Sequence, residues 1–167
     1  MILVFEKRHR MYIRMYLPKD ISEVTELLYN TVHTINLRDY SSAEVEAWAP
    51  KEIDKAAWNR RLSDNFTVVA EKDGIIVGFA SLANKEYYDL LYIHKDYQRQ
   101  GIASALTYSI EYEAALCGIS ELTADVSITA KPFFERMGYE VIREQSVERK
   151  GQSLTNYIMR KGLKKIY

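Results

Sequence analysis

The chain has 167 residues, and its 23 lysines and arginines balance 23 aspartates and glutamates, so the formal net charge is zero. This balance gives no electrostatic argument for binding bulk nucleic acid or an anionic membrane surface. The length suits one α/β domain with a substantial core. No apolar stretch approaches the length that crosses a membrane.

Cysteine and histidine usage gives no sign of disulfide or metal chemistry. The single cysteine, Cys117, excludes an intrachain disulfide and favours a reducing, cytoplasmic location. Because it falls near the end of a predicted helix, we interpret it as a small packing residue. The three histidines, His9, His33 and His94, lack the paired spacing of metal ligands, so we expect no metal site.

The first half of the chain predicts one strand and three helices. The strand is expected from alternation of apolar residues, and the helices from apolar stripes and capping residues. The strand covers residues 11–17, and the helices cover residues 21–37, 41–48 and 53–62. Residues 1–10 form an N-terminal extension, which is a short strand, a disordered arm or an upstream start.

The second half predicts a change to strands, joined by two further helices. A hairpin is indicated where two apolar runs flank a glycine-containing turn at residues 72–74. The predicted strands cover residues 66–70, 75–82, 87–93, 121–126, 139–147 and 154–160, and the helices cover residues 102–116 and 129–137. We find no repeat and no linker, so residues 11–167 are predicted to form a single α+β domain.

Residues 98–103, Gln-Arg-Gln-Gly-Ile-Ala, lie between an apolar strand and a helix. A short turn that opens a helix leaves several backbone N–H groups unpaired at the positive end of the helix dipole, which suits a pyrophosphate. Gly101 lets the backbone approach a ligand closely, and Arg99 offers a charge. By itself this turn is equally consistent with an ordinary strand-to-helix connection.

Two further segments, together with the strand before the turn, favour the phosphate-binding interpretation. Residues 11–20 resemble a first strand and helix cap, residues 91–103 a strand followed by a Q/R-x-x-G-x-G/A pyrophosphate loop, and residues 130–139 an A-x-x-F-Y-x-x-x-G-F helix. In this order and spacing they resemble the GNAT superfamily of acetyl-coenzyme A-dependent N-acetyltransferases. Residues 125–136 and 155–157 most resemble its YafP-like bacterial branch.

The resemblance implies a GNAT fold: a mixed, mostly antiparallel sheet of about seven strands, flanked by about four helices. Two of its parallel strands splay apart, and the pantetheine arm of acetyl-CoA enters between them. By position these strands end at Ile93 and Val126. The resemblance implies acetyl-CoA as co-substrate and no metal.

The same resemblance assigns cofactor-binding residues, with the backbone at residues 91–93 pairing with pantetheine and the loop at residues 98–103 holding the pyrophosphate. The implied set is Leu91, Tyr92, Ile93, Gln98, Arg99, Gln100, Gly101, Ile102, Ala103, Ser127, Phe133 and Phe134. Ser127 either caps the helix that follows or meets the cofactor, and the two roles can coexist. Phe133 and Phe134 either pack along the cofactor or serve only the core.

Two positions depart from the family pattern. Many relatives have a tyrosine at the position of Phe134, where its hydroxyl protonates the departing thiolate, and an asparagine at that of Ser127. Phenylalanine has no proton to give, so either another donor replaces it or the thiolate leaves unaided. A thiolate with a pKa of about 8.5 is a tolerable leaving group, so direct transfer stays possible.

The catalytic candidates are Asp89, His33 and Ser127. An ammonium acceptor must lose a proton before it attacks, so a carboxylate or imidazole is expected within reach. Alternation places Asp89 on the same side of its strand as Leu91 and Ile93; otherwise it is a solvated charge. His33 falls in a polar cluster near a helix end, in the region of the family's acceptor site. Tyr40, Trp48 and Tyr157 either line the acceptor pocket or pack in the core.

The preferred function is transfer of an acetyl group to a primary amine of a small molecule or peptide, by direct attack in a ternary complex. Two alternatives stay open: an acetyl-CoA-binding regulatory module with little turnover, which Phe134 favours, and acetylation of a macromolecule such as a protein or aminoacyl-tRNA. We expect no nucleic-acid or membrane partner, and either a monomer or a homodimer. The sequence does not identify the acceptor.

Overall fold

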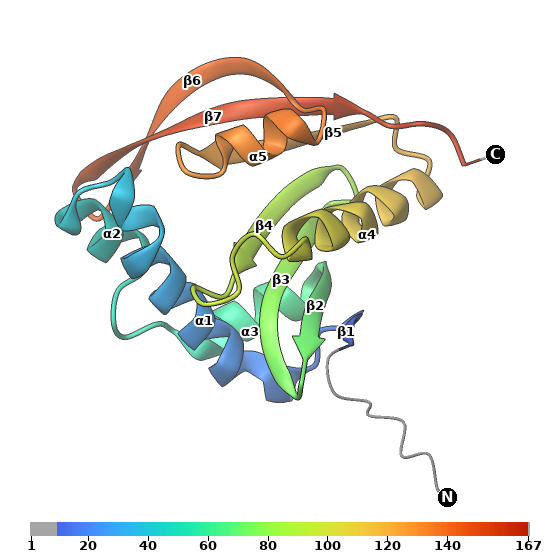
Figure 1. The fold of residues 1–167 in the computed structure, drawn as a ribbon. Coiled ribbons are helices and arrows are strands. Elements are labelled where there is room, and N and C mark those ends of the chain that lie inside the picture. Colours follow the sequence, from blue (N-terminus) through green and yellow to red (C-terminus); the bar gives the residue numbers. More distant parts are fainter. Residues whose placement is uncertain (1–9, 167) are drawn as a thin grey trace, which may run out of the picture.

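The computed structural model describes residues 10–166, and its helices and strands follow the predicted order (Figure 1). The strands are β1 Met11–Met15, β2 Phe66–Lys72, β3 Ile75–Ala83, β4 Tyr87–Ile93, β5 Glu121–Ser127, β6 Glu140–Arg149 and β7 Gln152–Gly162. The α-helices are α1 Ile21–Thr34, α2 Ser42–Trp48, α3 Lys55–Asp64, α4 Ile102–Leu116 and α5 Lys131–Arg136. Apart from Arg10, the predicted N-terminal extension lies outside the described residues.

Local sequence signals explain where several elements begin. Ser41 and Glu44 form the predicted capping box: Ser41 Oγ accepts from the Glu44 N–H at 3.1 Å, and Glu44 Oε1 accepts from the Ser41 N–H at 2.9 Å. Pro132 lies in the first turn of α5, where its missing N–H costs no helical hydrogen bond. Both predictions are confirmed.

Two predicted elements are too long at their C-terminal ends. The first strand ends at Met15, since Pro18 opens a 3₁₀ turn, η1 (Pro18–Asp20). The helix predicted over residues 21–37 ends at Thr34, and a second 3₁₀ turn, η2 (Asn36–Arg38), replaces its last turn. There the Asp39 N–H donates to the Asn36 carbonyl, so hydrogen bonds between residues three apart replace α-helical ones.

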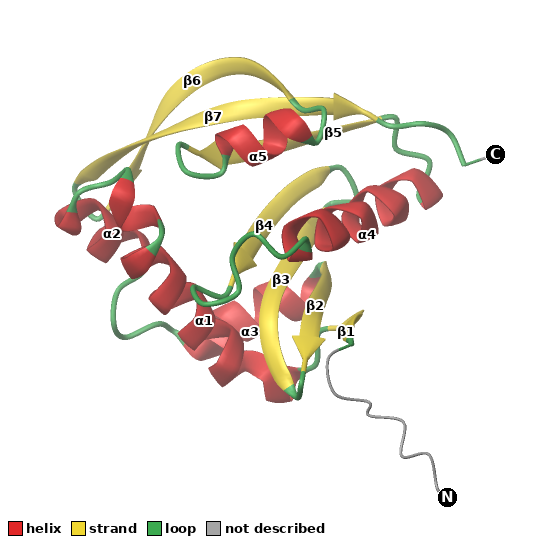
Figure 2. Ribbon diagram, viewed as in Figure 1, coloured by secondary structure: helices red, strands yellow, loops and turns green. Residues whose placement is uncertain are grey.

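The sheet has seven strands in the order β1-β2-β3-β4-β5-β7-β6. The β4–β5 pair is parallel and the other pairs are antiparallel, which confirms the predicted mixed sheet. The β4–β5 register contains a single residue pair, Tyr87 with Thr123. Figure 2 shows the consequence: β4 belongs to the lower half of the sheet, and β5 diverges from it to join β6 and β7.

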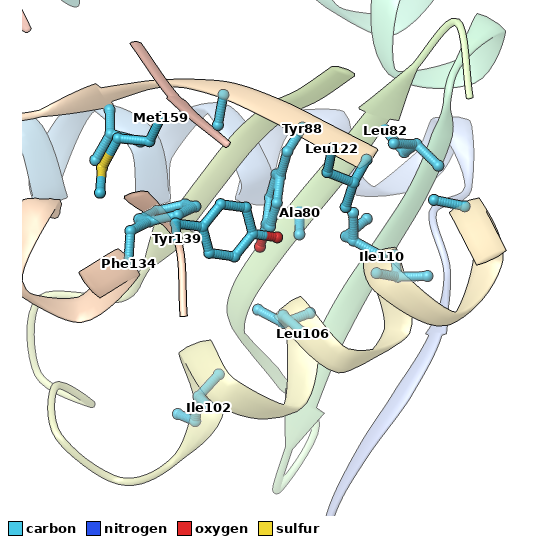
Figure 3. Packing of buried hydrophobic residues seen from close by; sticks show 14 of the residues in the cluster. Ala80, Leu82, Tyr88, Ile102, Leu106, Ile110, Leu122, Phe134, Tyr139 and Met159 are labelled. Carbon is cyan, nitrogen blue, oxygen red and sulfur yellow. The ribbon is translucent and has the colours of Figure 1, made fainter. Parts of the chain in front are cut away.

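Helices cover both faces of the sheet, and each face has its own apolar core. One core packs beneath α4 and α5 and includes Leu106, Ile110, Leu122 and Phe134 (Figure 3). The other packs beneath α1, α2 and α3. Gly78 of β3 lets α4 sit close to the sheet, because a Cβ there would lie only 3.0 Å from side-chain carbons of Ile93 and Leu106.

Candidate active site

A cavity of about 770 Å³ opens where β4 and β5 diverge. Its wall combines the C-terminal half of β4, the loop before α4, the end of β5, the start of α5 and the end of α1 with η2. All twelve residues predicted to bind the cofactor line it: Leu91, Tyr92, Ile93, Gln98, Arg99, Gln100, Gly101, Ile102, Ala103, Ser127, Phe133 and Phe134. The structure therefore brings the predicted set together around one space.

The free edge of β4 faces the gap. The His94 N–H donates to the Val77 carbonyl of β3 at 2.9 Å. Counting back along β4 from His94, every second residue bonds to β3, and the residues between them do not. By this alternation Leu91 and Ile93 direct their backbone N–H and C=O groups away from β3, towards β5. The Ile93 carbonyl is occupied, since it accepts from Thr31 Oγ1 and Gln98 Nε2. The backbone N–H and C=O groups of Leu91 and the N–H of Ile93 remain available to a ligand.

The loop before α4 presents backbone N–H groups to the other end of the cavity. Gly101 immediately precedes the helix with a φ of +79°, and Arg99 has a φ of +59°. The Ala105 N–H is the first to bond back, to the Gly101 carbonyl, so the N–H groups before it point out of the helix start. Gln98 has a structural part, because its side-chain amide donates to the Ile93 and His94 carbonyls.

The start of α5 forms the opposite wall. Ser127 Oγ accepts from the Ala130 N–H at 3.0 Å, so this hydroxyl closes the turn into α5. Phe134 is 4 % exposed, and its ring packs edge-on against Tyr88 and Tyr139, whose ring centroids lie 5.5 and 5.0 Å away (Figure 3). Phe134 thus serves the core while its ring also borders the cavity.

Three aromatic side chains bridge the two halves of the sheet beside the cavity. Trp48 Nε1 donates to Tyr92 Oη at 3.0 Å, and the Trp48 ring packs edge-on against Tyr40. Tyr40 Oη in turn accepts from the Ile128 N–H and donates to the Thr155 carbonyl. We call Tyr92, Trp48 and Tyr40 the aromatic bridge. Burial raises the pKa of both tyrosines to about 12, so both keep their protons at neutral pH.

Asp89 lines the cavity, but its orientation differs from the prediction. The β3–β4 register shifts so that Ser81 pairs with Leu90 and Leu82 with Tyr88, which leaves Asp89 as the extra residue of a β-bulge. The bulge breaks the alternation, and Asp89 faces α3 with both carboxylate oxygens accepting from Arg61, at 2.8 and 2.9 Å. The prediction that Asp89 shares a side with Leu91 and Ile93 was wrong.

His33 is not among the residues that line the cavity. Its Nε2 lies 2.7 Å from the Ala49 carbonyl oxygen, and its ring stacks on Tyr29 with centroids 4.1 Å apart. The helix predicted over residues 21–37 ends at Thr34, within the polar cluster that suggested a catalytic role, and of that cluster Asn36 and Arg38 of η2 line the cavity. The geometry therefore gives no support to His33 as a base.

Of the aromatic residues predicted for the acceptor pocket, only Trp48 lines the cavity. Tyr40 is 6 % exposed and lies behind Trp48 in the aromatic bridge. Tyr157 packs with the core beneath α4 and α5, where its ring lies under the Lys131 ammonium group.

The sequence analysis missed several cavity residues, of which Asp125, Thr129 and Arg136 bring polar chemistry. Arg136 was within reach of the sequence, because it stands three residues after Phe133 and so shares its side of α5. Thr129 lies in the turn before α5. Asp125 had no such local signal. Within residues 10–166, no three histidine, cysteine or acidic side chains gather into a metal site.

Comparison with known proteins agrees with this architecture. The acetyltransferase (GNAT) domain family matches residues 36–161. This chain belongs to the GNAT family of N-acetyltransferases. It is 37 % identical over 148 residues to YafP of Escherichia coli K12, an uncharacterised N-acetyltransferase, and this alignment covers 89 % of the chain and 93 % of YafP.

Solved GNAT structures share the fold. A GCN5-related N-acetyltransferase from Rhodopseudomonas palustris is 34 % identical, with a TM-score of 0.89 over 91 % of this chain and 95 % of that one. The PaiA N-acetyltransferase of Thermoplasma acidophilum, solved with coenzyme A, has a TM-score of 0.75 at 18 % identity, over 92 % of this chain and 99 % of that one. None of the described helices is long and apolar enough to span a membrane.

Proposed function

We propose that this GNAT protein transfers an acetyl group from acetyl-CoA to a primary amine of a small molecule or peptide, by direct attack within a ternary complex. The observation that carries the proposal is the shape of the cavity. The free edge of β4 and the N-terminus of α4 line one part of it. Trp48 and the polar residues Asn36 and Arg38 line another. The single cysteine agrees with a cytoplasmic location.

The described residues fit a long, anionic co-substrate. The N–H groups at residues 98–103 and the positive end of α4 suit a pyrophosphate, and Arg99 and Arg136 add positive charge at the cavity wall. A Cβ on Gly101 would meet no atom within 4 Å, so the loop leaves open space for phosphate oxygens. The backbone groups of Leu91 and Ile93 suit the pantetheine amides, as an added strand would. The coenzyme A complex of the PaiA neighbour supports this assignment.

The proposed reaction forms a C–N bond between the amine and the thioester carbonyl, and it breaks the C–S bond. Asp89 is the candidate base, because it is an acidic residue that lines the cavity. Both of its oxygens accept from Arg61, and each keeps a second lone pair for the amine proton. Phe134 supplies no proton, so coenzyme A leaves as the thiolate or takes a proton from another donor. Backbone N–H donors near the thioester oxygen carry the main rate enhancement. Ser127, held by its bond to the Ala130 N–H, positions the start of α5 beside the thioester.

A regulatory acetyl-CoA-binding module is the second candidate, and the absence of a hydroxyl at Phe134 favours it. One experiment separates the two functions. The chain is mixed with acetyl-CoA and a panel of primary amines, and free thiol and acetylated product are both quantified. We expect one thiol released for each acetylated amine. Thermal stabilisation by acetyl-CoA without thiol release for any amine would leave the binding module as the function.

A further inference from the structure

Two acidic residues flank the point where the sheet opens. The single residue pair between β4 and β5 is Tyr87 with Thr123, and Asp89 and Asp125 each stand two residues beyond that pair on the two strands. Both line the cavity. Because β4 and β5 run parallel, equal steps from the pair place these two residues across the widening gap from each other.

The two side chains also lie on the same face of the sheet. Ala124 and Val126 belong to the core beneath α4 and α5, so alternation directs Asp125 to the other face, which carries α1, α2 and α3. Asp89 also faces that side, towards α3. Burial raises the pKa of the Tyr87 phenol, and the charges of Asp125 and Asp89 raise it further, so both carboxylates lie near one hydroxyl.

The two carboxylates differ in their partners. Both oxygens of Asp89 accept from Arg61, whose positive charge balances that of Asp89. Asp125 is exposed, and it forms no ion pair with any of the described residues. It therefore leaves one unbalanced negative charge beside the Asp89–Arg61 pair. The arginines that line the cavity lie on other elements, namely Arg38 on η2, Arg99 in the loop before α4 and Arg136 at the end of α5.

The proposed orientation of acetyl-CoA brings its reacting end to these carboxylates. In that orientation the pyrophosphate lies at residues 98–103, beyond the C-terminal end of β4, and the pantetheine arm runs back along Ile93 and Leu91. An arm that continues in this direction reaches the level of Asp89 next. The thioester and the attacking amine then meet where Asp89 and Asp125 flank the gap.

We propose that Asp125 binds the acceptor as an ammonium ion, and that the acceptor is therefore an aliphatic amine, which is positively charged at neutral pH. The inference rests on the proposed function and narrows its substrate class. The ammonium group donates to the Asp125 carboxylate, while Asp89 takes the proton that must leave before the nitrogen attacks.

The remaining steps follow from this binding mode. The neutral nitrogen forms the C–N bond with the thioester carbonyl, and the C–S bond breaks with its electron pair on sulfur. The second proton of the nitrogen and the departing thiolate together give the free thiol of coenzyme A. An amine that is uncharged at neutral pH undergoes the same reaction but gains no ion pair with Asp125.

The first arm of the test compares two acceptors of similar shape and different charge. Benzylamine is an ammonium ion at neutral pH. Phenylhydrazine, in which an N–H group replaces the methylene group, is uncharged and keeps the terminal NH2. We expect the natural chain to bind benzylamine with a KM about tenfold or more below that for phenylhydrazine, as a charge-assisted hydrogen bond provides.

The second arm changes the carboxylate. Asp125→Asn keeps the shape and removes the charge, Asp125→Glu keeps the charge, and Glu121→Gln removes a charge from the same strand outside the cavity. We expect Asp125→Asn to raise the KM of benzylamine about tenfold to a hundredfold. The KM of phenylhydrazine on the same variant should change little, so the preference disappears. Asp125→Glu should keep part of the preference, and Glu121→Gln all of it.

Distinct results overturn the inference and the function beneath it. The inference fails if phenylhydrazine is as good an acceptor as benzylamine. It also fails if Asp125→Asn raises the KM of both amines equally, as a purely structural role would, or if a chain that binds acetyl-CoA acetylates neither amine. Should Asp125→Asn not fold, the same criterion applies to Asp125→Ala. Absence of acetyl-CoA binding by the natural chain would instead overturn the proposed function.

Discussion

At the scale of single residues, one side chain can both line the cavity and complete the core. Phe134 does so, because it lines the cavity and its ring packs edge-on against Tyr88 and Tyr139. Asp89 borders the cavity too, but Arg61 engages both of its oxygens. The chemical roles of these two residues can be tested by small substitutions that keep the shape of each side chain.

Replacement Asp89→Asn should lower kcat about a hundredfold, because a positioned general base typically contributes this much or more. Arg61→Met is the matched control, since it breaks the same ion pair and keeps the carboxylate. If steady-state kinetics show equal losses in the two variants, Asp89 is a structural partner of Arg61 and not the base.

Replacement Phe134→Tyr should raise kcat severalfold without changing the KM of acetyl-CoA, because the added hydroxyl gives the departing thiolate a proton. Stopped-flow detection of free thiol measures this step directly. The opposite substitution in a neighbouring ring, Tyr139→Phe, is a control for packing, because its hydroxyl bonds Glu111 instead of facing the cavity. An unchanged or lower rate in a folded Phe134→Tyr variant would show that protonation of the thiolate does not limit turnover.

At the scale of elements, the sequence predicts the order and kind of every strand and α-helix in the described chain, because each carries its own period or cap. The Ser41–Glu44 box and Gly101 are local signals of this kind. The bulge at Asp89 is different, since it arises from the register between β3 and β4 and leaves no trace in β4 alone. The aromatic bridge was equally hidden, because Trp48 and Tyr92 are 44 residues apart in the chain.

A partly buried ion pair links β1 to η1. Arg14 donates two hydrogen bonds to Asp20, at 2.8 and 3.0 Å, and Asp20 is 5 % exposed. Burial alone would raise the pKa of Asp20, but the hydrogen bonds from Arg14 and the Leu17 N–H outweigh it, so the pKa is lowered. The folded state therefore gains stability from this carboxylate above about pH 4, and it loses that stability as pH falls through the lowered pKa.

Replacement Asp20→Asn should lower the free energy of unfolding by about 2 kcal/mol at pH 7, as expected for charge-assisted hydrogen bonds. The difference from the natural chain should shrink as the pH drops below about 4. Urea titrations at several pH values measure both effects. Asp96→Asn, at an exposed carboxylate paired with Lys95, should cost little at any pH. A pH-independent loss at Asp20 would contradict the assignment.

At the scale of the whole molecule, the site is a consequence of sheet topology. The parallel β4–β5 pair holds at Tyr87 and Thr123 and then opens, and helices on both faces close the sides of the gap. α4 points its N-terminus at one end of this gap, and the aromatic bridge crosses the other. Family membership and this arrangement both support the proposed acetyl-CoA site, in which we propose that the Gly101 loop holds the pyrophosphate.

The most direct test of the account is calorimetric titration of acetyl-CoA into the natural chain, Gly101→Leu and Gly74→Leu. Both glycines have positive φ, of +79° and +77°, and both have open space at the Cβ position, so the two variants carry similar backbone strain. Only Gly101 lines the cavity. We predict one acetyl-CoA bound per chain, with affinity weakened at least tenfold in Gly101→Leu and unchanged in Gly74→Leu. Equal affinity in all three proteins, or no binding by the natural chain, would contradict the account.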